Sequence, residues 1–291
     1  HRRMSKDTLV IVGGGMAGLA TAYELHRRGI DFVLLEAGAR AGGVVLSEEI
    51  EGYTIDAGPD ALLAQKPDGI ALCQELGLGD RLISTKLPRT AYIQRDGRLH
   101  PLPASSVLGV PTRVGPFLRT SLFSWHGKIR MGAEIFVPPR RDGADESIGG
   151  FMTRRFGAEA AAYLAEPLLA GIHAGDVDRL SVRALFPRFV ELEQTYGSLI
   201  RGFRAQPRGP STGGPFRSLP GGLSELTRAI VAALPAASIR TGTPVERIAR
   251  EATSELRVQT TTGALQGPVV VLATPAYVTS RIVRDLDPRL A

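Results

Sequence analysis

The sequence predicts an α/β fold, in which a parallel sheet with packed helices is interrupted by a largely helical insertion. Three observations predict it. An aliphatic run at 9–12 ends in a glycine-rich turn and is followed by apolar residues at helical spacing. Two more aliphatic runs, at 31–35 and 268–275, have the composition of buried parallel strands. Between them, residues 104–205 change in character to helices and loops.

The glycine-rich turn at residues 13–18, Gly-Gly-Gly-Met-Ala-Gly, satisfies G-x-G-x-x-G. Its first glycine allows a tight turn, its second lets the backbone approach a pyrophosphate, and its third lets the helix pack closely on the sheet. The phosphates then lie over the helix N-terminus. Glu36, at the end of the second strand, is placed to accept hydrogen bonds from an adenosine ribose. A lone motif is compatible with an ordinary glycine turn, but strand, helix, strand and acid in register predict a Rossmann-like dinucleotide-binding domain.

The next elements are shorter. Residues 44–51 and 52–56 show strand-like alternation before Gly-Pro at 58–59, which predicts a sharp turn. Residues 67–77 predict a helix with proline near its start and glycine past its end. Residues 91–101 predict a hairpin around Asp96–Gly97, a favoured type I′ pair.

The insertion is predicted to contain several helices. Residues 128–137, 147–155 and 159–169 each predict one, and Ser181 is expected to cap another that runs through Leu192. Residues 206–215, rich in Gly, Pro and Ser, predict a flexible loop and a domain boundary.

The chain is then expected to return to the first domain. Residues 223–234 predict an amphipathic helix, 239–248 and 255–259 predict strands, and 268–275 predict a buried strand of the first sheet. The predicted division assigns 1–88 and 216–291 to the nucleotide-binding domain and 89–215 to the inserted substrate domain.

Composition limits the function classes. With 43% hydrophobic and 22% charged residues in 291, the chain has the composition of a soluble globular protein. Cys73 is the single cysteine, so neither a disulfide framework nor a thiolate metal site is expected, and its apolar setting predicts a buried helix residue. No apolar run approaches the roughly 20 residues that span a bilayer. We expect a cytoplasmic protein, with peripheral attachment to the inner face of the membrane as an open alternative.

The net charge of +6 is concentrated in one region. Within 109–141, Glu134 is the single acid, opposed by six basic residues: Arg113, Arg119, Lys128, Arg130, Arg140 and Arg141. Without zinc spacing or a nucleic-acid motif, we expect no nucleic-acid partner. Three interpretations of residues 113–141 stay open: a helical cap over the substrate cavity, attraction of an anionic substrate, or contact of Phe117, Phe123 and Trp125 with a membrane surface.

The run Glu36-Ala-x-x-Arg40-x-Gly42-Gly43 resembles the flavoprotein amine-oxidase superfamily, which binds FAD. Further motifs are similar to those of the porphyrinogen oxidases of haem biosynthesis. They stand at 58–60, 98–103, 166–176, 180–181 and 218–222. The segments 109–117 and 122–128 most resemble the Gram-positive-type branch, which makes coproporphyrin III.

The resemblance implies FAD as cofactor and two groups of contacts. The cofactor residues would be Gly13, Gly14, Gly15, Met16, Ala17, Gly18, Glu36, Ala37, Arg40, Gly42, Gly43, Val44, Gly58, Pro59, Asp60, Ala61 and Val245. Lys66 and Arg89 are the candidates for holding substrate propionates as charge-assisted pairs. No side chain is assigned as a catalytic acid or base, and no metal is expected.

The implied activity is the oxygen-dependent oxidation of coproporphyrinogen III or protoporphyrinogen IX to the porphyrin, by hydride transfer to FAD with hydrogen peroxide formed on reoxidation. The alternatives are another flavin oxidase, of the amine-oxidase or carotenoid-desaturase type, and an inactive FAD- or porphyrin-binding fragment. In the family a glycine-rich flavin-binding segment follows about where this chain stops, so we expect the chain to be C-terminally truncated.

Overall fold

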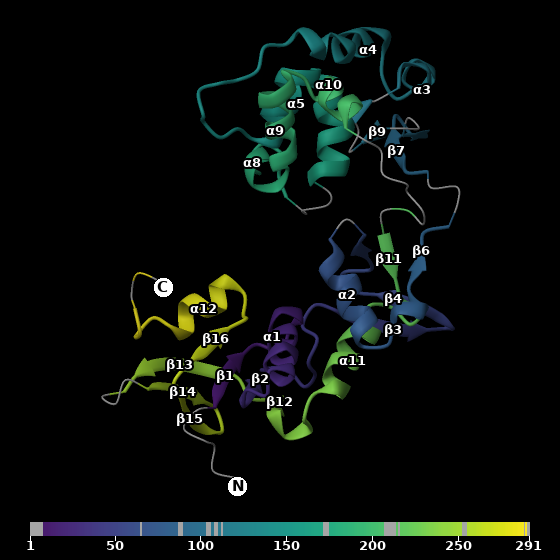
Figure 1. Cartoon of the computed structure of the whole chain (residues 1–291). Coiled ribbons are helices and arrows are strands. Elements are labelled where there is room, and N and C mark those ends of the chain that lie inside the picture. The colour runs from purple at the N-terminus through teal and green to yellow at the C-terminus, as the bar shows by residue number, and fades with distance from the viewer. Residues whose placement is uncertain are drawn as a thin grey trace. The chain divides into compact units, whose positions relative to one another are not determined.

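The computed structural model describes residues 8–64, 66–86, 90–102, 106–107, 110–111, 113–170, 175–206, 214, 216–251, 255–287 and 289. The chain divides into two compact units (Figure 1). Unit 1 comprises His1–Thr85 and Thr212–Ala291, and unit 2 comprises Lys86–Ser211. The predicted boundaries, after residues 88 and 215, lie close to these divisions. The role assigned to each part stays a prediction.

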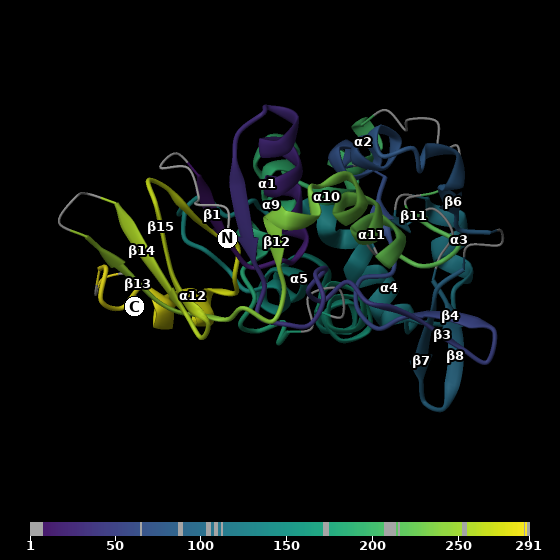
Figure 2. The same cartoon turned by 90° about the horizontal axis from the view of Figure 1, so that it is seen from below.

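Unit 1 is built on a parallel sheet with the strand order β12-β2-β1-β16, whose four strands are labelled in Figure 1. Figure 2 gives the view from below and labels β1 and β12 of this sheet. The strands of the sheet are β1 (Leu9–Val12), β2 (Phe32–Leu35), β12 (Ile239–Arg240) and β16 (Val270–Leu272). Strands β1 and β2 are apolar and almost wholly buried because both faces of the sheet are covered. This sheet with its helices confirms the predicted α/β class.

Different elements cover the two faces of the sheet. On one face, Ile11 and Leu34 pack with Leu19 of α1 (Met16–Arg27) and Ile230 of α11 (Ser224–Ala233). On the other face, Val10, Val12, Val33 and Leu35 pack with Ile248, Val258 and Ile282. These last three come from β13 (Val245–Arg250), β14 (Leu256–Thr260) and α12 (Ala276–Ile282). Strand β15 (Gly263–Gly267) completes the antiparallel sheet β13-β14-β15.

Two smaller strand groups complete unit 1. Strands β3 (Ser47–Ile50) and β4 (Tyr53–Asp56) form an antiparallel pair. Strand β11 (Phe216–Ser218) lies between β5 (Leu62–Leu63) and β6 (Ile83–Ser84), antiparallel to both. The chain therefore leaves unit 1 after β6 and returns at β11, which is hydrogen-bonded to β6. The remaining elements are α2 (Pro67–Glu75), η1 (Gly79–Arg81) and η4 (Ala236–Ser238).

One strand prediction in unit 1 is wrong. Residues 239–248 were expected to form a single strand, but they contribute β12 to the parallel sheet and β13 to the antiparallel one. Gly242 has a φ of +60° and Pro244 follows it, so the backbone turns between the two strands. By contrast, Cys73 is fully buried in α2 as predicted, and burial raises the pKa of its thiol.

Unit 2 is largely helical. Its helices are α3 (Val114–Arg119), α4 (Trp125–Gly132), η2 (Ala133–Phe136), α5 (Ile148–Phe156), α6 (Ala158–Ala160), the π-helix η3 (Ala161–Ala170), α8 (Val182–Leu185), α9 (Pro187–Tyr196) and α10 (Leu199–Ala205). Its strand pairs are β7 (Tyr92–Arg95) with β8 (Arg98–Pro101), and β9 (Ser106–Val107) with β10 (Val110–Pro111). The β7–β8 turn has positive φ at Asp96 (50°) and Gly97 (73°), which confirms the predicted type I′ hairpin.

Two expectations for unit 2 are corrected. The helix capped by Ser181 was expected to continue through Leu192, but it ends at Leu185, and α9 begins at Pro187. Proline lacks the amide hydrogen that a continuous helix needs, whereas at the first helical position it is well tolerated. Phe117 and Phe123, which one of the three open interpretations placed on a membrane surface, are only 7% and 5% exposed and pack in the core of the unit.

A buried ionic cluster also holds unit 2 together. Arg155 and Glu134 are both fully buried, and the guanidinium of Arg155 donates to the Glu134 carboxylate. Glu134 also accepts from the amide of Leu199, the first residue of α10 (2.9 Å), and from the Ser198 hydroxyl. Arg155 further donates to the carbonyls of residues 137 and 197. A buried charge is tolerated when it is paired and hydrogen-bonded in this way.

Candidate functional site

A hollow of about 850 Å³ lies in unit 1, at the edge where the parallel strands end. It is lined by Val12, Gly13, Gly15, Met16, Ala17, Leu35, Glu36, Ala37, Gly43, Val44, Thr243, Pro244, Val245, Glu246, Ala273, Thr274, Pro275, Tyr277, Val278, Arg281 and Ile282. Ligands of open α/β sheets characteristically bind in the crevice outside the carboxyl ends of the strands. We call this the strand-end hollow.

The start of α1 forms the floor of the strand-end hollow. Gly15 is the N-cap residue, and among the described residues no side chain caps this end or places an acid in the first turn. The first amide groups of a helix lack partners within the helix and attract anions. A Cβ added to Gly15 would meet only the Cα of Gly43, at 4.0 Å, so the space above the turn is open.

The other two glycines of the motif are required by close contacts. A Cβ on Gly18 would lie 1.8 Å from the carbonyl oxygen of Gly13. Gly13 has a φ of +104°, and its own Cβ would lie 2.6 Å from the carbonyl oxygen of Ala273. The turn, α1 and the end of β16 are therefore packed so closely that only glycine satisfies both positions.

Glu36 lines the strand-end hollow with its carboxylate already oriented. Oε2 accepts from the amide of Gly14 (2.6 Å) and Oε1 accepts from the amide of Gly38 (2.7 Å). An ionised carboxylate has about four acceptor positions. Glu36 therefore keeps capacity for hydroxyl groups of a ligand.

Arg40 holds the shape of the loop that borders the hollow. Its guanidinium donates to the carbonyls of Val45 (3.0 Å) and Gly43 (2.9 Å). Gly42 has a φ of +116°, and its amide donates to the carbonyl of Gly14 at 2.7 Å. The geometry explains the paired glycines, since a Cβ on Gly43 would lie 2.9 Å from the Cα of Gly15.

These features suit a dinucleotide. The open cradle above Gly15 and the uncapped start of α1 match a diphosphate, and the oriented Glu36 matches ribose hydroxyls. Val245, one of the predicted cofactor residues, lines the same hollow. The predicted residues that the structure brings together here are Gly13, Gly15, Met16, Ala17, Glu36, Ala37, Gly43, Val44 and Val245.

The other predicted residues do not line this hollow. Four of them make the contacts described above that hold the glycine turn and the loop bordering the hollow: Gly14, Gly18, Arg40 and Gly42. Gly58, Pro59, Asp60 and Ala61 lie between β4 and β5, where a Cβ on Gly58 would lie 1.9 Å from the Val44 carbonyl oxygen. Lys66 is exposed at the N-cap of α2, and Arg89 lies outside the described residues. Their ligand contacts stay predictions.

Part of the hollow was missed at the sequence level. Residues 273–282 follow β16, which pairs in parallel with β1, so they emerge at the same edge as the glycine turn. The predicted strand at 268–275 was the signal that could have located them, because the residues after a parallel strand lie at the edge where ligands bind. The neighbours of Val245 were also not predicted to line the hollow: Thr243, Pro244 and Glu246.

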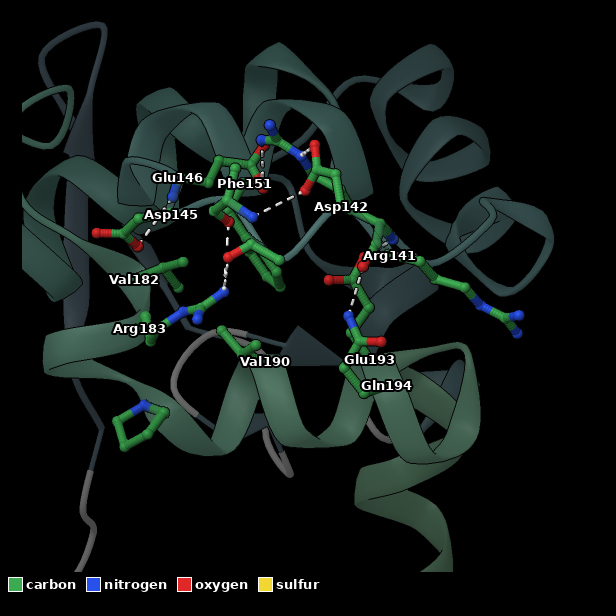
Figure 3. A pocket seen from close by; sticks show the side chains of 14 residues that line it. Arg141, Asp142, Asp145, Glu146, Phe151, Val182, Arg183, Val190, Glu193 and Gln194 are labelled. Atoms are coloured by element: carbon green, nitrogen blue, oxygen red, sulfur yellow. Dashed lines mark hydrogen bonds and ion pairs between the residues drawn. The ribbon is translucent and has the colours of Figure 1, made fainter.

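A second hollow, of about 360 Å³, lies in unit 2 between the loop 140–146 and the helices α5, α8 and α9 (Figure 3). Its acidic side chains already have partners. Asp142 accepts from Arg140 (2.7 Å), while Glu146 and Glu193 accept from Arg154 (2.8 and 2.7 Å). Among the described residues, no cluster of His, Cys, Asp or Glu side chains is arranged to hold a metal ion.

The sequence and the fold both match known flavoproteins. The model of the flavin-containing amine oxidoreductase family matches residues 16–290. The chain is 36% identical to coproporphyrinogen III oxidase of Bacillus subtilis, over 84% of this chain and 54% of that protein. It is 32% identical to the coproporphyrinogen III oxidase of Propionibacterium freudenreichii, over 97% of this chain and 60% of that protein. The chain thus spans a little over half the length of these curated relatives.

Solved structures agree. A candidate protoporphyrinogen oxidase from Exiguobacterium sp. 255-15 superposes with a TM-score of 0.84 and 36% identity, over 99% of this chain and 64% of that one. Putrescine oxidase bound to putrescine shares the fold, with a TM-score of 0.68 at 18% identity. The family match confirms the predicted cofactor, FAD. The chain belongs to the flavin-containing amine oxidoreductase family.

Proposed function

We propose that this chain is part of an enzyme that oxidises a porphyrinogen to the porphyrin, with coproporphyrinogen III as the preferred substrate and protoporphyrinogen IX as the second candidate. The observation that carries the proposal is the 36% identity to a coproporphyrinogen III oxidase over 84% of the chain. The strand-end hollow supports it by offering a site of the right chemistry for FAD.

Each two-electron step removes one hydride and one proton from the macrocycle and reduces one dioxygen to hydrogen peroxide. FAD, when bound, supplies the redox chemistry by accepting the hydride and passing the electrons to dioxygen. The residues of this chain bind and orient it. The turn 13–17 holds the diphosphate, Glu36 accepts from ribose hydroxyls, and the backbone of Val245 contacts the adenine. Catalysis of this kind depends mainly on positioning.

Lys66 and Arg89 are proposed to hold propionates of the substrate. Lys66 is exposed and can reach a carboxylate as a point charge. Replacing either residue by alanine should raise KM and leave kcat nearly unchanged. Unchanged KM values for both variants would remove them from the site.

The test of the function uses the chain loaded with FAD and given either porphyrinogen in air. Porphyrin fluorescence is followed against a control without protein. The same assay is run on this chain joined to the C-terminal part of the Bacillus subtilis relative. Faster oxidation of coproporphyrinogen III supports the proposal, and a preference for protoporphyrinogen IX changes the substrate. If neither form oxidises either substrate, the proposal fails, and another flavin oxidase activity or a binding module takes its place.

We also propose that unit 2 contacts an anionic membrane through α3, α4 and η2. The supporting observation is a set of large exposed apolar side chains beside basic ones. These are Val114, Leu118, Trp125, Ile129 and Phe136, each between 44% and 78% exposed. Exposed Arg113 and Arg119 flank them, and the acid of this region, Glu134, is buried. Apolar burial and attraction to anionic lipid add in such surfaces.

Within the described residues, no helix has the length and apolar character that spanning a bilayer requires, so the contact proposed is peripheral. Cosedimentation with vesicles that contain anionic lipid should fall when Trp125 and Ile129 are both replaced by serine. Equal cosedimentation of the variant, or none by the unmodified protein, would leave the helical cap as the preferred interpretation.

A further inference from the structure

The strand-end hollow has a wall that the family motifs do not indicate. Helix α12 follows β16, and the residues just before it lie close to the glycine turn: a Cβ added to Gly13 would meet Ala273 and Thr274. The Thr274 and Thr279 hydroxyls are 2.7 Å apart, which ties the helix to the loop before it. Ile282, 4% exposed, anchors the end of α12 in the core that Val245 also contacts.

Four residues of this helix line the hollow, and two of them, Tyr277 and Arg281, carry polar groups. Tyr277 and Arg281 are four residues apart and so lie on the same face of α12. The guanidinium carbon of Arg281 is 6.0 Å from the centroid of the Tyr277 ring. The ring is nevertheless 71% exposed, so most of its apolar surface is available to a ligand.

The charge of this wall suits the cofactor. Among the described residues that line the hollow, Glu36 and Glu246 are acidic and Arg281 is basic. The Glu36 carboxylate is oriented by backbone amides, not by a cation. A bound dinucleotide adds a negatively charged diphosphate and a flat base. The planar guanidinium of arginine stacks on flat π-systems and pairs with phosphates.

We infer that Tyr277 and Arg281 form a further wall for the adenosine diphosphate half of FAD. The Tyr277 ring and the Arg281 guanidinium pack against the adenosine, and the charge of Arg281 offsets that of the diphosphate. The inference rests on the proposed function only in the identity of the cofactor. It assigns to α12 a binding role beside those of the glycine turn and Glu36.

The test is a set of equilibrium titrations of the apoprotein, followed by flavin fluorescence, with FAD, with FMN, and with ADP as competitor. Tyr277→Ala and Arg281→Ala should each weaken FAD and ADP about tenfold and leave FMN unchanged. Tyr277→Phe keeps the ring and should bind like the unmodified protein. Arg284→Ala is the matched control, because Arg284 is exposed just beyond α12 and does not line the hollow.

Three results would overturn the inference. Unchanged FAD and ADP affinity in both alanine variants would remove α12 from the site while leaving the proposed function intact. An equal loss for FMN and FAD would show that these residues act on the flavin end or on the fold. An unmodified protein that binds neither FAD nor ADP would overturn the cofactor site itself, and the inference with it.

Discussion

The strand-end hollow of unit 1 and the hollow of unit 2 differ in the partners of their polar groups. In unit 1, no described side chain caps the start of α1, and the space above Gly15 is open. In unit 2, the acids Asp142, Glu146 and Glu193 are bonded to arginines of the same unit. The comparison shows that a ligand site is better recognised by polar groups that still lack a hydrogen-bond partner in the protein than by the number of its charged side chains.

The comparison predicts that the paired acids of unit 2 act on stability alone. Replacing Glu134 by alanine leaves Arg155 buried without its partner, and breaking a buried pair in this way costs about 3–5 kcal/mol. Trp125 is the only tryptophan and lies in unit 2, so urea unfolding followed by its fluorescence reports on this unit. FAD affinity should stay unchanged.

The control for that variant is Arg201→Ala, an exposed change in the neighbouring helix α10. It should shift the unfolding free energy by less than about 0.5 kcal/mol. A loss of FAD binding in Glu134→Ala would contradict the prediction that this ion pair affects stability alone.

In unit 1, Gly18→Ala should cost both stability and binding. Its Cβ would collide with the Gly13 carbonyl, and a backbone collision of this kind typically costs about 2–3 kcal/mol. FAD titration and urea unfolding followed by circular dichroism measure the two effects. The unfolding transition of unit 2, followed by Trp125 fluorescence, should occur at the same urea concentration as in the unmodified protein. A variant that binds FAD normally would show that the turn can relax.

Gly15→Ala sharpens the comparison because it separates binding from stability. The added methyl group enters open space above α1, so the apoprotein should unfold at nearly the same urea concentration. FAD affinity should fall about 10- to 100-fold, which corresponds to about 1.4–2.7 kcal/mol, since the methyl group occupies the place of the diphosphate. Unchanged affinity would mean that the diphosphate does not lie there.

The smallest effect is expected at Glu225, a paired carboxylate of unit 1 outside the strand-end hollow. The guanidinium of Arg81 donates to it (2.8 and 2.9 Å), and with the Gly221 amide it holds the pKa of Glu225 below its usual value. The stabilisation is complete above the unfolded-state pKa of about 4.3 and is lost as the pH falls through the lower folded-state value. Glu225→Gln should remove this part of the acid dependence of Tm. An identical Tm–pH profile would show that the pair does not contribute.

Local sequence patterns predicted local structure well. The aliphatic run before the glycines became β1, and the residues after them became α1, because both follow from contacts near in sequence. The Asp96–Gly97 hairpin was predictable for the same reason. Two predictions were wrong because a proline or a glycine was not treated as a break. The helix predicted to continue through Leu192 ends at Leu185, before Pro187, and the single strand predicted at 239–248 is divided near Gly242.

The site was predicted where the glycine turn and the loop after β2 carry it and, through the family resemblance, at Val245. Tyr277 and Arg281 reach the hollow because β16 pairs with β1 across most of the chain. The sequence predicted that 268–275 belongs to this sheet, but not which strand it pairs with. The burial of Phe117 and Phe123 likewise depends on packing with distant helices of unit 2. Non-local pairing therefore decides which residues complete the wall of the hollow.

The pairing of β6 with β11 has a consequence for how such proteins diversify. The register Arg217 opposite Ser84 fixes the two ends of the insertion about one strand spacing apart, close to 5 Å. The entropic cost of closing a loop rises only slowly with its length. An interchangeable module of almost any size can therefore be grafted between these two strands. Exchanging that module would leave the architecture of unit 1 unchanged.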